Sequence, residues 1–160
     1  MSRAERDAVL DEIEAMYRER YAVFLRVATA VVGDADLARD AVHDAFVRAV
    51  RHRRQFRGGS LEGWLWRIVV NAARRRRADR FWRRHVPLVE GTAAASSPNG
   101  DLRALVAALP ERQRLALFLR YYADLDYRSI AEALGVRPGT VAATMHQAHA
   151  SLKRSLEAER

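Results

Sequence analysis

The segment 125–152 constrains the fold more than any other part of the chain. Apolar residues at three- and four-residue spacing lie on both sides of a short break, which predicts two helices and a tight turn. Gly135 suits the left-handed end of the first helix, and Pro138 suits the first turn of the second. The small residues Ala131 and Gly135, with Val141 beyond them, let the helices cross closely. We predict a helix-turn-helix whose second helix enters the DNA major groove, with an ordinary helical hairpin as the alternative.

The rest of the chain also has helical periodicity, and no stretch predicts a strand convincingly. The expected helices run over about 8–32, 36–54, from 61 to the low eighties, 101–109 and from Pro110 onward. We expect Gly33 to end the first of these helices. We expect Asp34 or Asp36, Ser60 and Asp101 to be the N-caps of the helices that follow them.

Residues 86–100 are small, polar and aperiodic, which is typical of a linker. We therefore predict an all-α protein of two small helical domains joined by a flexible linker. The first domain spans 1–85, and the second, which holds the helix-turn-helix, spans 101–160.

A dense basic block lies at the end of the first predicted domain. The net charge is +8, and 13 arginines fall between Arg48 and Arg84, with tryptophan and phenylalanine interleaved. Cations that follow phosphates beside rings that stack on bases suit single-stranded nucleic acid. The alternative is a solvated face over a core, and we expect Trp64 to be a core residue because it shares one stripe with Ile68 and Ala72.

Composition argues against several other classes of protein. There is no cysteine, hence no disulfide or thiolate metal site, and no apolar run approaches the roughly 20 residues of a membrane span. We expect a soluble cytoplasmic protein without membrane insertion. An enzyme is a weaker alternative: His146 and His149 lie three apart and could share a metal, but no third ligand at motif spacing, phosphate loop or nucleophile motif is evident. We predict no catalytic residue, metal or cofactor.

Three segments, in order, resemble an extracytoplasmic-function (ECF, group 4) sigma factor of the sigma-70 family. GDADLARDAVHDAFVRAVRH resembles the polymerase-binding helix of sigma domain two, and FRGGSLEGWLWRIVVNAARRRR resembles its −10-reading segment. LPERQRLALFLRYYADLDYRSIAEALGVRPGTV resembles the start of sigma domain four. The resemblance implies a promoter-specificity subunit that binds core RNA polymerase, recognises −35 and −10 elements and aids melting. The alternative is a helix-turn-helix regulator that binds DNA without polymerase, often as a dimer on a palindrome.

The resemblance also implies contact residues and partners. The positions that match the contact with the basic β′ clamp helices of polymerase are Asp40, His43, Asp44 and Val47. The positions that match −10 contacts, including a loop for a flipped base, are Arg53, Phe56, Arg57, Ser60, Trp66, Asn71, Arg74 and Arg75. The positions that match −35 contacts are Arg137, Pro138, Thr140, Ala142, Thr144, His146, Gln147 and His149. The implied partners are core polymerase, through its β′ clamp helices and β flap, promoter DNA and an anti-sigma factor.

The chain departs from the family pattern at several of these positions. His43 stands where the family usually has Gln, and Val70 and Arg75 stand where Arg and Asp are common. The reading helix has VAATMHQAHASL where the family often has VKSRLHRARAAL, so basic groups are lost. Each phosphate contact normally adds to affinity and to its salt dependence. We therefore expect a positioning module that binds weakly alone and acts when tethered to polymerase and the first domain.

Overall fold

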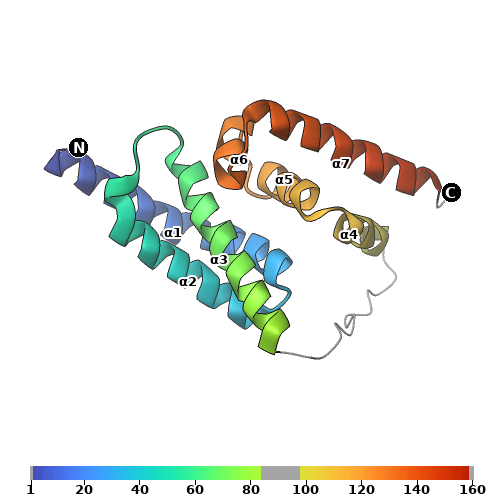
Figure 1. The fold of residues 1–160 in the computed structure, drawn as a ribbon, viewed down its shortest axis with the longest axis horizontal. Coiled ribbons are helices and arrows are strands. Elements are labelled where there is room, and N and C mark those ends of the chain that lie inside the picture. The colour runs from blue at the N-terminus through green and yellow to red at the C-terminus, as the bar shows by residue number, and fades with distance from the viewer. Residues whose placement is uncertain (1, 84–97, 159–160) are drawn as a thin grey trace.

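The computed structural model describes residues 2–83 and 98–158, and these form helices joined by short turns with no strand among them (Figure 1). This confirms the predicted all-α fold class. The helices are α1 (Arg3–Val32), α2 (Ala35–His52), the 3-10 turn η1 (Arg53–Gln55), α3 (Leu61–Arg83), α4 (Pro98–Ala108), α5 (Glu111–Tyr121), α6 (Tyr127–Leu134) and α7 (Pro138–Ala158). We call α1–α3 the N-terminal half and α4–α7 the C-terminal half.

Helix α1 begins at Arg3, earlier than its apolar stripe predicts. The reason is a capping box, in which Ser2 and Glu5 satisfy each other's backbone N–H groups. Gly33 ends the helix with φ 77°, as predicted. Of the two candidate caps for α2, Asp34 is used, and its carboxylate accepts from the N–H groups of Asp36 and Leu37.

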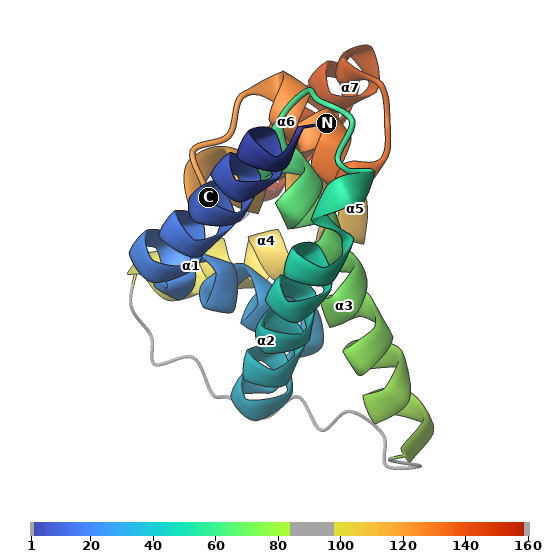
Figure 2. The same cartoon turned by 90° about the vertical axis from the view of Figure 1, so that its left-hand side faces the viewer.

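Helices α1, α2 and α3 pack against one another, and α3 also packs against α6 of the C-terminal half (Figures 1 and 2). Helix α3 is therefore buried along two sides, which explains why it lacks a single apolar stripe. The prediction placed Trp64 in the core and Trp66 at the DNA, whereas Trp64 is only partly buried and Trp66 is completely buried. Its ring stacks on Phe24 with centroids 4.2 Å apart.

The C-terminal half begins earlier than predicted. Helix α4 starts at Pro98, so the last three residues of the predicted linker 86–100 are helical and Asp101 lies inside the helix instead of capping it. Proline is tolerated in a first helical turn because its missing N–H would have no partner there. The remainder of the predicted linker lies outside the described residues. Pro110 precedes α5 as predicted. Leu115, Phe118, Leu119 and Tyr122 share one helical stripe, which predicts that all four face inward, but Tyr122 is about half exposed.

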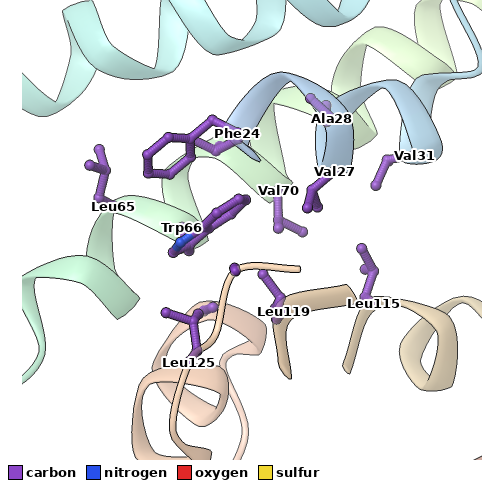
Figure 3. Close-up of a cluster of buried hydrophobic side chains, with 14 of the residues drawn as sticks. Phe24, Val27, Ala28, Val31, Leu65, Trp66, Val70, Leu115, Leu119 and Leu125 are labelled. Carbon is purple, nitrogen blue, oxygen red and sulfur yellow. The ribbon is translucent and has the colours of Figure 1, made fainter. Parts of the chain in front are cut away.

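The helix-turn-helix is formed by α6 and α7. Asp126 caps α6 by accepting from the Ser129 N–H, and Gly135 ends it in the left-handed conformation with φ 66°. Val141, Met145 and Ala148 are buried against the rest of the C-terminal half, as their spacing predicts. The cluster in Figure 3 joins the two halves, since Phe24, Trp66 and Val70 face Leu115, Leu119 and Leu125.

Candidate polymerase and nucleic-acid interfaces

The four predicted polymerase contacts form one exposed row on α2. Asp40, His43, Asp44 and Val47 follow helical three- and four-residue spacing, and all four side chains are exposed. The inward positions between them, including Ala41, Val42, Ala45 and Phe46, are buried. The amphipathic character of α2 therefore presents the row to the outside while its other side holds the core.

Asp44 is paired with Arg76 of α3, a contact that the sequence analysis missed. The hydrogen bond from Arg76 to Asp44 raises the pKa of the Arg76 guanidinium, and the charges of Asp44, Asp40 and Asp79 add to this effect. The signal was present in the four consecutive arginines, but their spacing alone does not show which one turns back toward α2. Asp40 is then the carboxylate of the row that has no ion-pair partner among the described residues.

An apolar groove lies beside this row, between α1 and α2. Val47 and His43 of the row line this groove, and Tyr17 and Phe46 contribute aromatic lining. The Tyr17 and Phe46 rings meet edge-on with centroids 4.8 Å apart. A groove with an apolar floor and a polar rim can receive a side chain or a helix from a protein partner.

The predicted −10 residues divide into two groups. The first group comprises Arg53, Phe56, Arg57, Asn71 and Arg75. Arg57, Asn71 and Arg75 are exposed. Arg53 donates to the Val50 carbonyl at 2.7 Å, and Phe56 lies against Trp64. The loop before α3 turns through Gly58 and Gly59, which have φ of 93° and 91° and open space around them. This loop therefore presents Arg57 at the surface.

The second group is covered by the C-terminal half. The Ser60 hydroxyl lies 2.7 Å from the Ser129 hydroxyl of α6. Arg74 donates to Glu111 of α5 at 3.0 Å, and Trp66 is completely buried. Trp66 is therefore not available to DNA in this arrangement, whereas Ser60 and Arg74 stay partly exposed with their polar groups engaged by the C-terminal half.

Most of the predicted −35 residues lie on one side of α7. Arg137, Pro138, Ala142, His146, Gln147 and His149 are exposed, and Thr140 is partly exposed. Thr144 is different, because it is buried and its hydroxyl donates to the Thr140 carbonyl at 2.7 Å. We therefore leave Thr144 out of the candidate DNA-contact set.

The C-terminal half also has aromatic contacts that the sequence analysis did not identify. The Tyr121 hydroxyl lies 2.9 Å from Nε2 of His149, so the end of α5 contacts the middle of the reading helix. Arg26 of α1 lies over the Tyr122 ring, 5.3 Å from its centroid, and explains why a tyrosine stays at the surface there.

Within the described ranges, no helix is long and apolar enough to cross a membrane. In the same ranges, no three His, Asp or Glu side chains are grouped as they would be around a metal ion. The pair His146 and His149 therefore has no third candidate ligand among these residues.

Two family descriptions match the chain, in the order that the sequence analysis expects. Residues 16–85 match "Sigma-70 region 2" and residues 99–152 match "Sigma-70, region 4". Together they span most of the chain, and the chain belongs to the sigma-70 family of RNA polymerase sigma factors, with relatives of the ECF kind. Promoter recognition with RNA polymerase is the function of such factors, which supports the main prediction over a regulator that acts without polymerase.

Curated relatives agree with this assignment. The chain is 29% identical to "ECF RNA polymerase sigma factor SigE" of Mycolicibacterium smegmatis over 89% of its length, although it spans only 60% of that relative. It is 28% identical to "RNA polymerase sigma factor YlaC" of Bacillus subtilis, covering 94% of this chain and 95% of that one.

Solved structures show that the fold is shared along nearly the whole chain. CnrH in complex with the cytosolic domain of CnrY has a TM-score of 0.68 at 19% identity, covering 97% of this chain and 96% of that one. The sigma factor RpoE in complex with the anti-sigma factor NepR from Bartonella quintana has a TM-score of 0.62 at 22% identity, covering 98% and 97%.

Proposed function

We propose that this sigma factor, a group 4 member, docks on core RNA polymerase through the exposed row on α2. The observation that carries the proposal is the placement of Asp40, His43, Asp44 and Val47 on one accessible side of a helix whose other side is core. The carboxylates suit the basic β′ clamp helices, and the neighbouring apolar groove adds area that excludes water.

The two halves divide promoter recognition between them. In this proposal, residues 1–85 act as the −10 and polymerase domain, and the C-terminal half, beginning at Pro98 instead of residue 101, acts as the −35 domain. The exposed arginines of α3, such as Arg75, and the loop that holds Arg57 follow the phosphates of the opened −10 strand. Helix α7 lies in the −35 major groove. The chain performs no bond chemistry and needs no cofactor, because it acts by binding opened promoter DNA more tightly than closed promoter DNA.

The proposed partners follow from this role. The C-terminal half meets the polymerase β flap, and an anti-sigma factor holds the protein inactive. The proposal of an anti-sigma partner is supported by the similarity in fold to sigma factors whose solved structures contain an anti-sigma factor or the cytosolic domain of CnrY. We place the protein in the cytoplasm, where its polymerase works.

The test of the docking surface is Asp40→Arg. Asp44→Arg is less informative because it also breaks the pair with Arg76. We expect Asp40→Arg to abolish capture of core polymerase, with an unchanged circular dichroism spectrum. Asp11→Arg makes the same charge change at an exposed position on α1 and should capture core normally. Undiminished capture by Asp40→Arg would remove α2 from the proposed interface.

The role in transcription is tested by run-off transcription on a genomic library with added core polymerase. We expect new start sites that share −35 and −10 motifs upstream. Footprinting on those promoters should require core polymerase. Protection by the factor alone at the same concentration would instead indicate a regulator that acts without polymerase.

A further inference from the structure

Helices α3 and α6 approach each other closely at Gly63. A Cβ atom at this position would lie 2.8 Å from the Ser129 carbonyl oxygen and 2.8 Å from the Glu132 Cβ. The first of these neighbours is backbone and cannot move aside without moving α6, which explains a glycine inside α3.

A small cavity lies beside this close approach. It has a volume of about 270 Å³ and is lined by Arg67 of α3, by Arg128, Ala131 and Glu132 of α6, and by the turn that runs from Gly135 to Pro138. Of these residues, only Pro138 belongs to the surfaces proposed above for polymerase and DNA. The cavity is therefore a separate feature of the molecule.

Two arginines from different halves of the chain line this cavity without a carboxylate partner. Within the described residues, neither Arg67 nor Arg128 forms an ion pair. The carboxylate of Asp126 is close in sequence to Arg128, but it is engaged as the cap of α6 and accepts from the Ser129 N–H at 2.8 Å. Like charges that line one cavity repel each other, so an anion placed between them relieves that repulsion.

The end of α6 does not account for the position of Arg67. Its guanidinium lies over Gly135, where an added Cβ would be 3.6 Å from Nη2. The last carbonyl oxygens of α6, those of Ala131 and Glu132, already accept from the backbone N–H groups of Gly135 and Val136. Among the residues that the structure describes, the Arg67 guanidinium has no hydrogen-bond partner, so its donors can bind a ligand.

The size and the charge of the cavity together select the ligand. Pockets that enclose drug-sized ligands measure roughly 300–1,000 Å³, so this one suits a small group and not a whole nucleotide. Its charged lining is Arg67, Arg128 and Glu132, two positive charges and one negative, which leaves a net charge of +1. Guanidinium groups donate pairs of parallel hydrogen bonds to phosphate oxygens, and one phosphate has enough oxygens for both arginines.

We propose that this cavity binds a phosphate group, held between Arg67 of α3 and Arg128 of α6. The group is inorganic phosphate or the terminal phosphate of a small molecule, because a phosphate within a DNA strand is bonded to sugars on both sides and has fewer free oxygens. Glu132 limits the affinity, since its carboxylate repels the ligand. A ligand that binds only the folded chain stabilises it in proportion to the logarithm of ligand concentration. The proposal does not rest on the proposed function.

Titration calorimetry of the full chain with inorganic phosphate tests the site. We expect saturable binding of phosphate and a melting temperature that rises with its concentration. Sodium chloride at the same ionic strength should produce neither effect. Phosphate is kept at low millimolar concentration, so that its general stabilising action as a salt stays small.

Substitutions locate the binding and control for general electrostatics. Arg67→Gln and Arg128→Gln should each weaken phosphate binding about tenfold or more, because charge-assisted hydrogen bonds are lost. Arg112→Gln makes the same charge change at an exposed position on α5, outside the cavity, and should bind normally. Glu132→Gln removes the repelling carboxylate and should tighten binding several-fold, a gain that damage to the fold cannot produce.

The remaining outcomes overturn the proposal. One is the absence of saturable phosphate binding, and another is equal weakening by all three arginine substitutions, which would show a general effect of net charge. In a parallel arm, a −35 duplex from a mapped promoter is bound by the polymerase complex. If Arg67→Gln and Arg128→Gln weaken duplex binding and leave phosphate binding unchanged, the arginines serve the DNA backbone instead. Core capture and run-off transcription by the unsubstituted protein judge the proposed function separately, whichever result the phosphate titration gives.

Discussion

The carboxylate of Glu111 accepts from Arg74 at 3.0 Å and lies 3.4 Å from Arg77, so one acidic residue of α5 meets two arginines of α3. Burial raises the pKa of Glu111, but the hydrogen bond and charge of Arg74, assisted by Arg77, outweigh burial and hold that pKa below its usual value. The charged carboxylate therefore stabilises the folded chain. This contribution is fully present above the ordinary pKa of glutamate, about 4.3, and is lost as the pH falls through the lower pKa of the folded state.

We predict that Glu111→Gln lowers the free energy of unfolding at pH 7 by about 1 kcal/mol or less, because both partners are partly exposed. The difference from the unsubstituted protein should shrink in acid, below about pH 4. Urea unfolding at pH 7 and pH 3 measures both values. Glu157→Gln, at an exposed position on α7, is the control and should show little effect at either pH. A difference that stays constant with pH would contradict the role assigned to the charge.

The cap of α6 gives a second prediction. Asp126 accepts from the Ser129 N–H at 2.8 Å, and this bond is the main reason that the pKa of Asp126 lies below its usual value. Asp126→Ala should lower the free energy of unfolding by about 1 kcal/mol, the typical loss for an N-cap. Asp126→Asn keeps an acceptor and should retain most of that stability. Equal losses for the two variants, measured by chemical denaturation, would show that the side-chain acceptor is not what matters.

The turn of the helix-turn-helix gives a third prediction. Gly135 has φ 66°. A Cβ atom added there would meet only the Arg67 guanidinium, at ordinary contact distance. Gly135→Ala should therefore cost about 1–2 kcal/mol through backbone strain and not through a clash. Asparagine tolerates the left-handed conformation better, so Gly135→Asn should cost less. Thermal unfolding of the two variants side by side checks the order, and a larger loss for asparagine would argue against strain as the cause.

The helix-turn-helix was predictable because local residues determine it. Gly135 and Pro138 mark the turn, and Val141, Met145 and Ala148 repeat at the spacing of one buried side. The row on α2 was predictable as an exposed surface for the same reason, since a helix with one buried side has one free side. Its role as a polymerase contact came from the family resemblance and stays a proposal.

The contact between the halves was not predictable from local patterns. Helix α3 is buried on two sides, so Trp64 and Trp66 both fit an inward position and periodicity does not choose between them. The pairs of Ser60 with Ser129 and Arg74 with Glu111 join residues far apart in the sequence, and no spacing rule connects them. Gly63 was the available signal, because a glycine inside a helical pattern often marks a close approach of backbones.

Two residues near the middle of α3 should differ in how they affect promoter opening. Asn71 is exposed, whereas Arg74 is bound to Glu111. Asn71→Ala should lower open-complex formation more than closed-complex binding. Arg74→Ala removes a proposed strand contact and also breaks the pair with Glu111, so it should lower the free energy of unfolding as well as melting. Permanganate probing and gel shift on the same promoter separate the two steps, and equal losses in both assays for Asn71→Ala would exclude it from the melting role.

The reading helix gives the last prediction, which concerns how affinity depends on salt. Arg137 is exposed at the start of α7, and the positions that follow along its outer side are Ala142, His146 and Gln147. We expect Arg137→Ala to weaken binding of the polymerase complex to a mapped promoter and to reduce the slope of log affinity against log salt by about one, because one phosphate contact is lost. Gln147→Ala carries no charge change, so it should leave that slope unchanged while altering the preference among −35 sequences. Filter binding across a salt series measures both effects. An unchanged slope for Arg137→Ala would mean that Arg137 does not contact a phosphate.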